Sequence, residues 1–110
     1  MQAQIVLTNC PDAEVAKKIA HHLVRSHLAA CVNILAPCQS VYQWQGQLCE
    51  ETEVPLLIKT TAAAYPALEA AIRQLHPYEL PEIVAFDLKQ GLPAYLDWLA
   101  EQTFCPPASY

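Results

Sequence analysis

The side chains best suited to chemistry in this sequence are thiols and imidazoles. Five cysteines occur, at positions 10, 31, 38, 49 and 105, and no two of them form a CxxC pair. A soft-metal carrier would need such a pair, so direct transfer of copper between paired thiols is disfavoured. The odd number of cysteines indicates reduced thiols and a cytoplasmic protein. We expect Cys31, Cys38 and Cys105 to be small apolar packing residues.

A cysteine enzyme would pair Cys10 or Cys31 with His76 as its base. Such a nucleophile needs a base within hydrogen-bond reach and a third group that orients the base. The sequence supplies neither an evident third group nor an oxyanion hole, and its two glycines cannot form a phosphate-cradling loop. His21 and His22 are adjacent on an expected helix and point in different directions, which favours a helix-surface role. The sequence therefore predicts a protein that is not an enzyme.

Two aromatic side chains, Tyr42 and Trp44, lie two residues apart on an extended segment and so project from the same face of it. One interpretation is packing in an interface between subunits, where tyrosine and tryptophan are enriched. The other is a wall of a small-molecule pocket in a cleft between subunits, with Lys59, Tyr78 and Glu79 as polar contacts. Both interpretations place the segment at a subunit boundary.

The segment that carries these aromatics is predicted to be one long β-hairpin over Leu28–Thr61. Its first limb, Ala29–Trp44, is apolar almost throughout, and its second limb is Glu53–Thr61. Gln45-Gly46-Gln47 separates the limbs, and glycine tolerates the positive φ that a tight hairpin turn needs. An acidic run in the same segment, Glu50, Glu51 and Glu53, is predicted to be solvated and to discourage unwanted strand pairing.

A strand and a helix are predicted before the hairpin. Ala3–Thr8 alternates and contains β-branched residues, as a strand does. Asp12 predicts the N-cap of a helix that runs to about His27. Its apolar face carries Val15, Ile19 and Leu23 at intervals of four residues.

A helix, a strand and a further helix are predicted after the hairpin. The first helix has its apolar stripe at Tyr65, Leu68, Ile72 and Leu75, with Pro66 tolerated in the first turn. Residues 76–82 contain two prolines and are expected to be irregular, and Ile83–Leu88 is a short apolar strand. The last helix starts at Pro93, and its apolar side carries Leu92, Tyr95, Leu96 and Leu99.

The resulting order, β-α-β-β-α-β with a C-terminal helix, predicts an α+β fold of ferredoxin-like type. We expect one domain over residues 1–104 and a non-helical tail over 105–110. Helices would cover one face of the antiparallel sheet and leave the other face bare. An apolar bare face is typical of an interface.

Composition narrows the possible partners. Of the 110 residues, 54% are hydrophobic and 15% are charged, which is few charges for the surface of so small a domain and favours a homo-oligomer. The net charge of -5 and the scattered Lys and Arg residues argue against a nucleic-acid partner. No apolar run reaches the roughly 18 residues of a membrane span, and the N-terminal MQAQIVLTN lacks a secretory pattern.

Five strings stand in a characteristic order: LAACVNI at 28–34, SVYQWQG at 40–46, EVPLLIKTT at 53–61, HPYELPEI at 76–83 and YLDWL at 95–99. Together they resemble the CutA family of divalent-cation tolerance proteins, over about Ile5–Leu99. The resemblance implies a cytoplasmic homotrimer of ferredoxin-like subunits in which the long hairpin adds to a neighbour's sheet. It also implies a role in tolerance of copper and other divalent ions, and an assembly similar to that of the PII signalling proteins.

The resemblance further implies a metal site. In members that bind copper, the ligands fall at the end of the first strand and in the His-Pro-Tyr motif. The first position is Thr8 here, and a second histidine found in such members is Leu75, so the ligands carried over are Cys10 and His76. Thiolate and imidazole together suit copper or zinc.

Two ligands are too few for a closed metal site, so Glu79, Glu82 or a neighbouring subunit would have to contribute. This implies weak binding of copper or another divalent cation.

An alternative for His76 is that its ring fixes the loop that follows it. The alternative for the whole protein is a PII-like trimeric scaffold that binds a small molecule in the intersubunit cleft.

Overall fold

The computed structural model describes residues 1–104 as five strands and three helices. In chain order they are β1 (Ala3–Cys10), α1 (Ala13–Arg25), β2 (Cys31–Ile34), β3 (Cys38–Trp44), β4 (Gln47–Thr61), α2 (Tyr65–Leu75), β5 (Ile83–Asp87) and α3 (Pro93–Gln102). The strands pair antiparallel in the order β2-β4-β1-β5, and β3 pairs with the first half of β4. The predicted α+β order and ferredoxin-like sheet are confirmed. The predicted tail, 105–110 with Cys105, lies outside the described residues.

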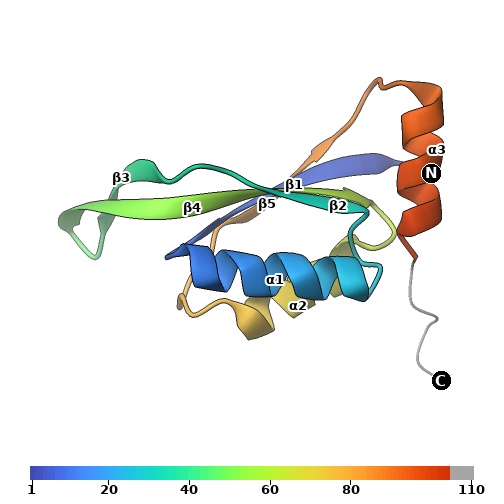
Figure 1. Ribbon diagram of the computed structural model, residues 1–110. Helices are drawn as coiled ribbons and strands as arrows, with labels where there is room; N and C mark the ends of the chain where they lie inside the picture. Colours follow the sequence, from blue (N-terminus) through green and yellow to red (C-terminus); the bar gives the residue numbers. More distant parts are fainter. Residues whose placement is uncertain (105–110) are drawn as a thin grey trace.

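The hairpin turn lies where the sequence predicted it. Trp44 pairs with Gln47, and the two residues between them, Gln45 and Gly46, have φ of 52° and 79°. A type I′ turn needs positive φ at both of these positions. β4 therefore starts directly after the turn, earlier than the predicted Glu53. It contains 15 residues, and its first half extends beyond the helices (Figure 1).

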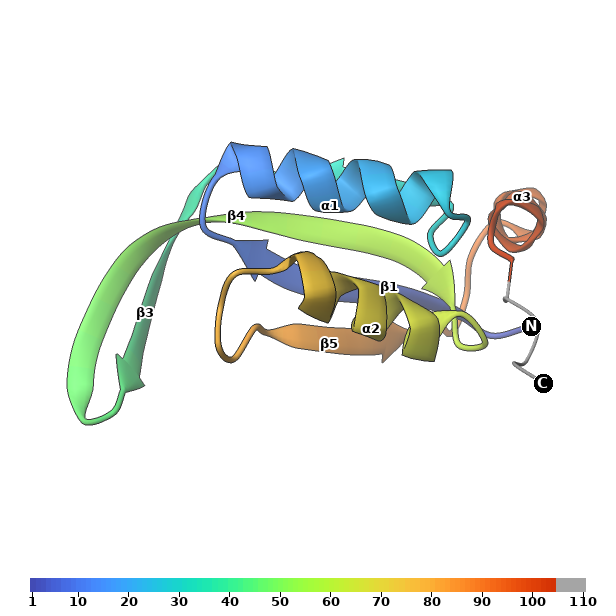
Figure 2. The same cartoon turned by 90° about the horizontal axis from the view of Figure 1, so that it is seen from below.

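The first limb of the hairpin is not one strand, so the prediction of a continuous limb over Ala29–Trp44 was wrong. β2 and β3 are separated by residues 35–37, which include Pro37 and lie opposite Pro55 of β4. Proline has no N–H to donate to a strand ladder. The ladder therefore breaks where both strands carry a proline, and the hairpin changes direction relative to the sheet (Figure 2).

The core lies between one face of the sheet and helices α1 and α2 (Figure 2). Alternate residues of the strands point into it, as the period of two requires. Its fully buried side chains include Val6 and Cys10 of β1, Leu56 and Ile58 of β4, Ile19 and Leu23 of α1, and Leu68 and Ile72 of α2. Each large aliphatic side chain buried in this way contributes roughly 1.5–3 kcal/mol.

The helix ends follow the sequence signals. The Asp12 side chain accepts a hydrogen bond from the N–H of Val15 at 2.8 Å, which confirms the predicted N-cap of α1. Pro66 lies in the first turn of α2, as predicted. α3 packs at the end of the sheet remote from the hairpin tip (Figure 1), where Leu99 is buried with Ala3 and Ala30.

The predicted apolar stripe of α3 was wrong in part. Leu92 is 71% exposed because it precedes the helix as its N-cap residue, and Tyr95 is 40% exposed. Leu99 is the one member of the stripe that is fully buried, with Leu96 packed beside it. No helix among residues 1–104 is long and apolar enough to cross a membrane.

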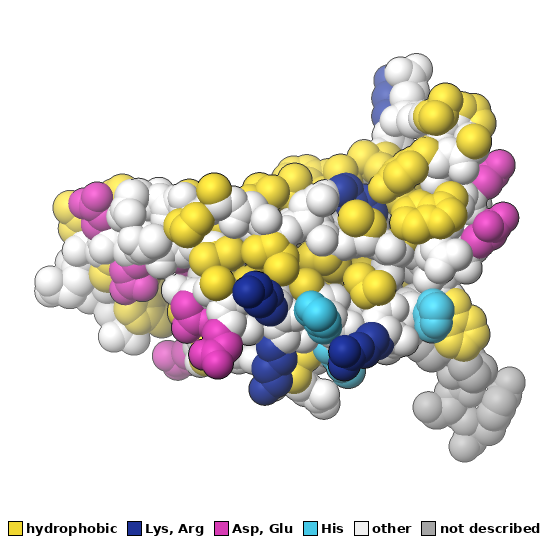
Figure 3. Space-filling view, in the orientation of Figure 1, with side chains coloured by type: hydrophobic (Ala, Val, Ile, Leu, Met, Phe, Trp, Pro, Cys, Tyr) yellow, Lys and Arg dark blue, Asp and Glu magenta, His cyan; other side chains and the backbone are white. Residues whose placement is uncertain are grey.

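The other face of the sheet is covered by a helix only at its end, where α3 packs near Ala3, and the rest of this face is open and apolar. Register places Ile5 and Leu7 of β1 beside Leu57 of β4 and beside Val84 and Phe86 of β5 on this open face. Val84 is 42% exposed and Phe86 is 53% exposed. Hydrophobic side chains gather along this side of the molecule with few basic side chains among them, whereas most of the Lys, Arg and His side chains in this view lie lower, toward the helices (Figure 3).

Candidate ligand-binding pocket

A cavity of about 460 Å³ lies where the β3–β4 hairpin, the end of β1 and the loop between α2 and β5 meet. Its lining contains aromatic, acidic and amide side chains and one leucine: Asn9, Tyr42, Trp44, Glu51, Glu53, Tyr78, Glu79, Leu80 and Glu82. Pockets of this size fit small organic molecules. Three segments far apart in the sequence therefore build one site within a single chain.

The hairpin wall follows from the strand register. Because the turn holds two residues, Trp44 faces Gln47 and Tyr42 faces Cys49. Directly opposed residues of an antiparallel pair project from the same face. Continuing along β4, Glu51 and Glu53 then share the face of the two aromatics. The hairpin thus presents two aromatic rings and two carboxylates to one cavity.

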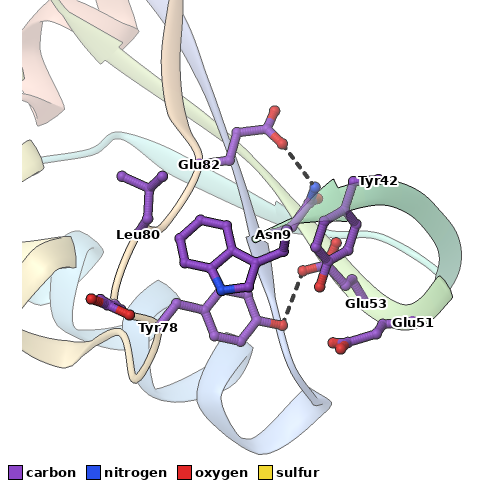
Figure 4. A pocket seen from close by; sticks show the side chains of 9 residues that line it. Asn9, Tyr42, Glu51, Glu53, Tyr78, Leu80 and Glu82 are labelled. Atoms are coloured by element: carbon purple, nitrogen blue, oxygen red, sulfur yellow. Dashed lines mark hydrogen bonds between the residues drawn. The ribbon is translucent and has the colours of Figure 1, made fainter. Parts of the chain in front are cut away.

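Glu53 is the most buried of these acidic residues. Its side chain is only 7% exposed, and its carboxylate accepts a hydrogen bond from the Tyr78 hydroxyl at 3.0 Å. Figure 4 shows Tyr78 reaching from its loop to Glu53 on the hairpin. The prediction that the acidic run is solvated is therefore wrong for Glu53. The missing information was that the loop after His76 folds over this end of β4.

Burial and the neighbouring carboxylate also act on Tyr78. Burial first, and then the hydrogen bond and charge of Glu53, raise the pKa of the Tyr78 hydroxyl. The pKa of Tyr42 is raised as well, by burial and then by the charge of Glu51. Both phenols therefore keep their protons at neutral pH and act as hydrogen-bond donors.

His76 fixes the loop that carries Tyr78. The backbone N–H of Tyr78 donates to Nδ1 of His76 at 3.2 Å, so this nitrogen carries no proton. The other ring nitrogen, Nε2, then donates to the carbonyl of Asn9 at 2.6 Å. The rings of His76 and Tyr78 also contact each other, tilted by 56° at a centroid distance of 4.6 Å. Both nitrogens are thus occupied, as the loop-fixing alternative for His76 requires.

Cys10 lies on the opposite side of β1 from the pocket. It is fully buried in the helix-covered core, whereas its neighbour Asn9 lines the cavity. Burial, followed by the charges of Asp12 and Glu53, raises the pKa of the Cys10 thiol to about 11. Since a metal binds the thiolate, this environment disfavours metal binding at neutral pH.

The structure does not gather the proposed metal ligands Cys10, His76, Glu79 and Glu82 in one place. Glu79 and Glu82 line the pocket, and the other two do not. In the part of the chain that the structure describes, no three His, Cys, Asp or Glu side chains are grouped closely enough to hold a metal ion. Glu82 instead accepts a hydrogen bond from the Asn9 amide at 3.2 Å.

Of the proposed cleft residues, Tyr42, Trp44 and Tyr78 line the cavity and Lys59 does not. Lys59 lies six residues beyond Glu53 along β4, or about 20 Å, and donates a hydrogen bond to Asn33. Sequence reasoning missed Asn9, Leu80 and the two hairpin carboxylates as lining residues. A register counted from the two-residue turn could have found Glu51 and Glu53.

The fold and the pocket define a class of protein: a small ferredoxin-like α+β domain with a ligand-sized cavity at the base of an extended hairpin. A scan against protein-family profiles matches residues 4–102 to the family described as CutA1 divalent ion tolerance protein. The chain belongs to this family.

Individual relatives agree with this assignment. The chain is 49% identical over 100 residues to the divalent-cation tolerance protein CutA of Thermus thermophilus, with 91% of this chain and 97% of that protein covered. It is 44% identical to the mouse protein CutA over 86% of this chain, which spans about half, 53%, of the mouse protein.

Solved structures show the same fold. The divalent cation tolerance protein of Thermus thermophilus superposes with a TM-score of 0.91 at 48% identity, covering 93% of this chain and 99% of that chain. CutA1 from Oryza sativa superposes with a TM-score of 0.92 at 35% identity, covering 94% of this chain and 95% of that chain.

Proposed function

We propose that this member of the divalent-cation tolerance family is a trimeric, non-catalytic binding protein whose hairpin pocket takes a small molecule. The observation that carries the proposal is the cavity of about 460 Å³, walled by Tyr42, Trp44 and Tyr78. A concave site that combines aromatic walls with polar groups placed to orient a ligand is the usual form of a small-molecule site. This role is that of a scaffold or signalling trimer of PII type.

The open sheet face supports the trimer. A monomer rarely exposes a contiguous apolar surface of this kind, with Val84 and Phe86 about half exposed. Register places Asn9 on the same face of the sheet as Leu7. A subunit seated on the open face would therefore lie beside the pocket, consistent with a cleft between subunits. The low content of charged residues favours a homo-oligomer, and the net charge of -5 argues against a nucleic-acid partner. The four cysteines among residues 1–104 are free thiols, which favours the cytoplasm.

The burial of Cys10 and the hydrogen bonds of His76 support a non-catalytic role. A cysteine nucleophile must be an accessible thiolate. Cys10 is fully buried, and its pKa of about 11 keeps it protonated at neutral pH. The candidate base, His76, has both ring nitrogens engaged with backbone groups. These contacts leave neither residue free to begin proton transfer.

Weak binding of copper or another divalent cation at Cys10 and His76 is the second candidate function. One observation favours it: Nε2 of His76 lies 2.6 Å from the carbonyl of Asn9, the residue next to Cys10. A metal would have to displace this hydrogen bond and the thiol proton. Both costs lower the affinity, so we expect weak binding that grows with pH.

Two measurements test the proposal. Native mass spectrometry of the reduced protein, before and after one equivalent of copper, should show a trimer that takes up copper weakly. Tight uptake of three ions that disappears in the Cys10→Ala/His76→Ala variant would favour the metal function instead.

Ligand-observed NMR with a fragment library of neutral, anionic and cationic compounds is the second measurement. It should find compounds that bind to the wild-type protein and no longer bind to Trp44→Ala.

A further inference from the structure

The pocket has an unbalanced charge. Four of its lining side chains are carboxylic acids, at positions 51, 53, 79 and 82, and no Lys, Arg or His within residues 1–104 lines it. Carboxylates in a partly enclosed site with low-dielectric walls focus a negative potential. A cation entering the cavity is therefore favoured over a neutral molecule or an anion.

Glu53 is the carboxylate of the pocket that most needs a positively charged partner. Its side chain is more than nine-tenths buried, and the neutral Tyr78 hydroxyl is the hydrogen-bond partner that the described residues give its carboxylate. An ionised carboxylate has about four acceptor sites, so one hydroxyl leaves most of this capacity unused. Buried charges in proteins are ordinarily paired. A positively charged donor is the group that would complete this pairing.

The aromatic walls select among cations. Tyr42, Trp44 and Tyr78 present π systems, and aromatic faces attract ammonium groups, most strongly when these are desolvated. A divalent metal needs converging oxygen, nitrogen or sulfur ligands, and no such group of three occurs in the described part of the chain. The volume of about 460 Å³ also leaves room for an apolar body, which Leu80 would contact.

We propose that the pocket recognises a small organic cation, an alkyl or arylalkyl ammonium group attached to an apolar body. This inference rests on the proposed small-molecule function and names the chemical class of its ligand. The ammonium N–H groups donate to Glu53 and lie against the aromatic rings. Tyr78 orients the Glu53 carboxylate, and Asn9 orients Glu82 through the 3.2 Å hydrogen bond (Figure 4).

The test uses the full chain with Trp98→Phe, so that Trp44 is the single tryptophan and its fluorescence can be excited selectively over that of the tyrosines. Trp98 lies on α3, at the opposite end of the molecule from the hairpin (Figure 1). Three probes of matched length are titrated at low ionic strength: hexylammonium, 1-hexanol and hexanoate. We expect hexylammonium to bind about tenfold or more tightly than hexanol, as one charge-assisted contact would give. Hexanoate should bind most weakly.

Paired variants assign the effect to Glu53. Glu53→Gln keeps an oxygen acceptor for Tyr78 and removes the charge, so hexylammonium affinity should fall about tenfold. Glu50→Gln makes the same charge change on β4 outside the pocket and should leave the affinity unchanged. If Glu53→Gln fails to fold, Glu51→Gln provides a second lining carboxylate, with a smaller expected loss.

The outcomes separate this inference from the proposed function. Equal binding of hexylammonium and hexanol, abolished by Trp44→Ala, would overturn the cation preference and leave the small-molecule pocket standing. Failure of all three probes and of the fragment library would overturn both. Displacement of hexylammonium by equimolar magnesium or copper would show that the pocket prefers a metal and would also overturn the inference.

Discussion

The two halves of β4 differ sharply although they are one continuous strand. The second half, residues 54–61, pairs with β1 and β2 and buries Leu56 and Ile58 completely beneath the helices. The first half, residues 47–53, pairs with β3 alone and carries exposed or acidic side chains. One half therefore supplies stability, and the other half projects from this scaffold to form a binding site.

The boundary between the halves lies at Val54 and Pro55. There the partner strand changes from β2 to β3, and Glu53 is the last residue before the core begins. Glu53 is buried by the loop carrying Tyr78 rather than by the helices. The site therefore has at its base a buried carboxylate that lies directly next to the core.

The largest effect is expected for a substitution in the buried half of β4, residues 54–61. Ile58→Ala removes a fully buried side chain and leaves a cavity, so the free energy of unfolding should fall by about 2–5 kcal/mol. Leu48→Ala, in the hairpin half, changes a side chain that is 73% exposed and should cost less than about 0.5 kcal/mol. Urea denaturation checks both. Equal losses would mean that the hairpin half is as deeply packed as the core half in the assembled protein.

The next prediction concerns the open face that both halves adjoin. Phe86→Glu places a charge on this apolar surface. If the proposed trimer buries this surface between subunits, the charge should weaken the trimer by about 3 kcal/mol, or roughly a hundredfold in dissociation constant. Val24→Glu makes the same change at a similarly exposed site on α1 and should leave the trimer intact. Sedimentation velocity reads the oligomeric state. An intact Phe86→Glu trimer would place the interface elsewhere.

A smaller effect is expected where the loop meets the hairpin half. His76→Ala removes both ring hydrogen bonds and leaves the carbonyl of Asn9 unpaired, at a cost of about 1–3 kcal/mol. The loop should then loosen and Trp44 fluorescence should shift. His21→Ala, on the exposed surface of α1, is the matched control. Unchanged stability in His76→Ala would contradict the loop-fixing role.

The effect that is smallest at neutral pH is a pH dependence that arises from Cys10 in the core. The pKa of Cys10 is raised from 9.0 to about 11 in the folded protein, so above pH 9 the unfolded chain loses this proton first. The contribution of Cys10 to the free energy of unfolding is therefore fully present below pH 9, and it is lost as the pH rises to about 11. Cys10→Ala should flatten that slope in urea titrations, whereas Cys49→Ala should not. A slope unchanged by Cys10→Ala would assign it to other groups, such as Tyr78.

Most of the scaffold could be predicted because its signals are local. Apolar periodicity marked the helices, Asp12 marked a cap, and Gly46 marked the hairpin turn. The break opposite Pro55 was missed because it requires a proline on each of two paired strands. That coincidence appears only once the register of the hairpin is known.

Less of the site could be predicted because it depends on contacts between distant segments. The shared face of Tyr42 and Trp44 follows from strand parity, and both line the pocket. The burial of Glu53 depends on a hydrogen bond across 25 residues of sequence, and the separation of Cys10 from the cavity depends on which face of β1 the helices cover. Neither the burial of Glu53 nor the position of Cys10 can be predicted from sequence spacing alone.

The most direct test of the division of β4 is a ¹H–¹⁵N correlation spectrum of the assembled protein, titrated with hexylammonium. We expect shifts for the Trp44 indole N–H and for the amides of Glu53 and Tyr78. The Trp98 indole N–H and the amides of residues 56–61 should not move. Shifts centred on Cys10 and on the core half of β4, with Trp44 unchanged, would contradict the assignment of the ligand site to the hairpin half.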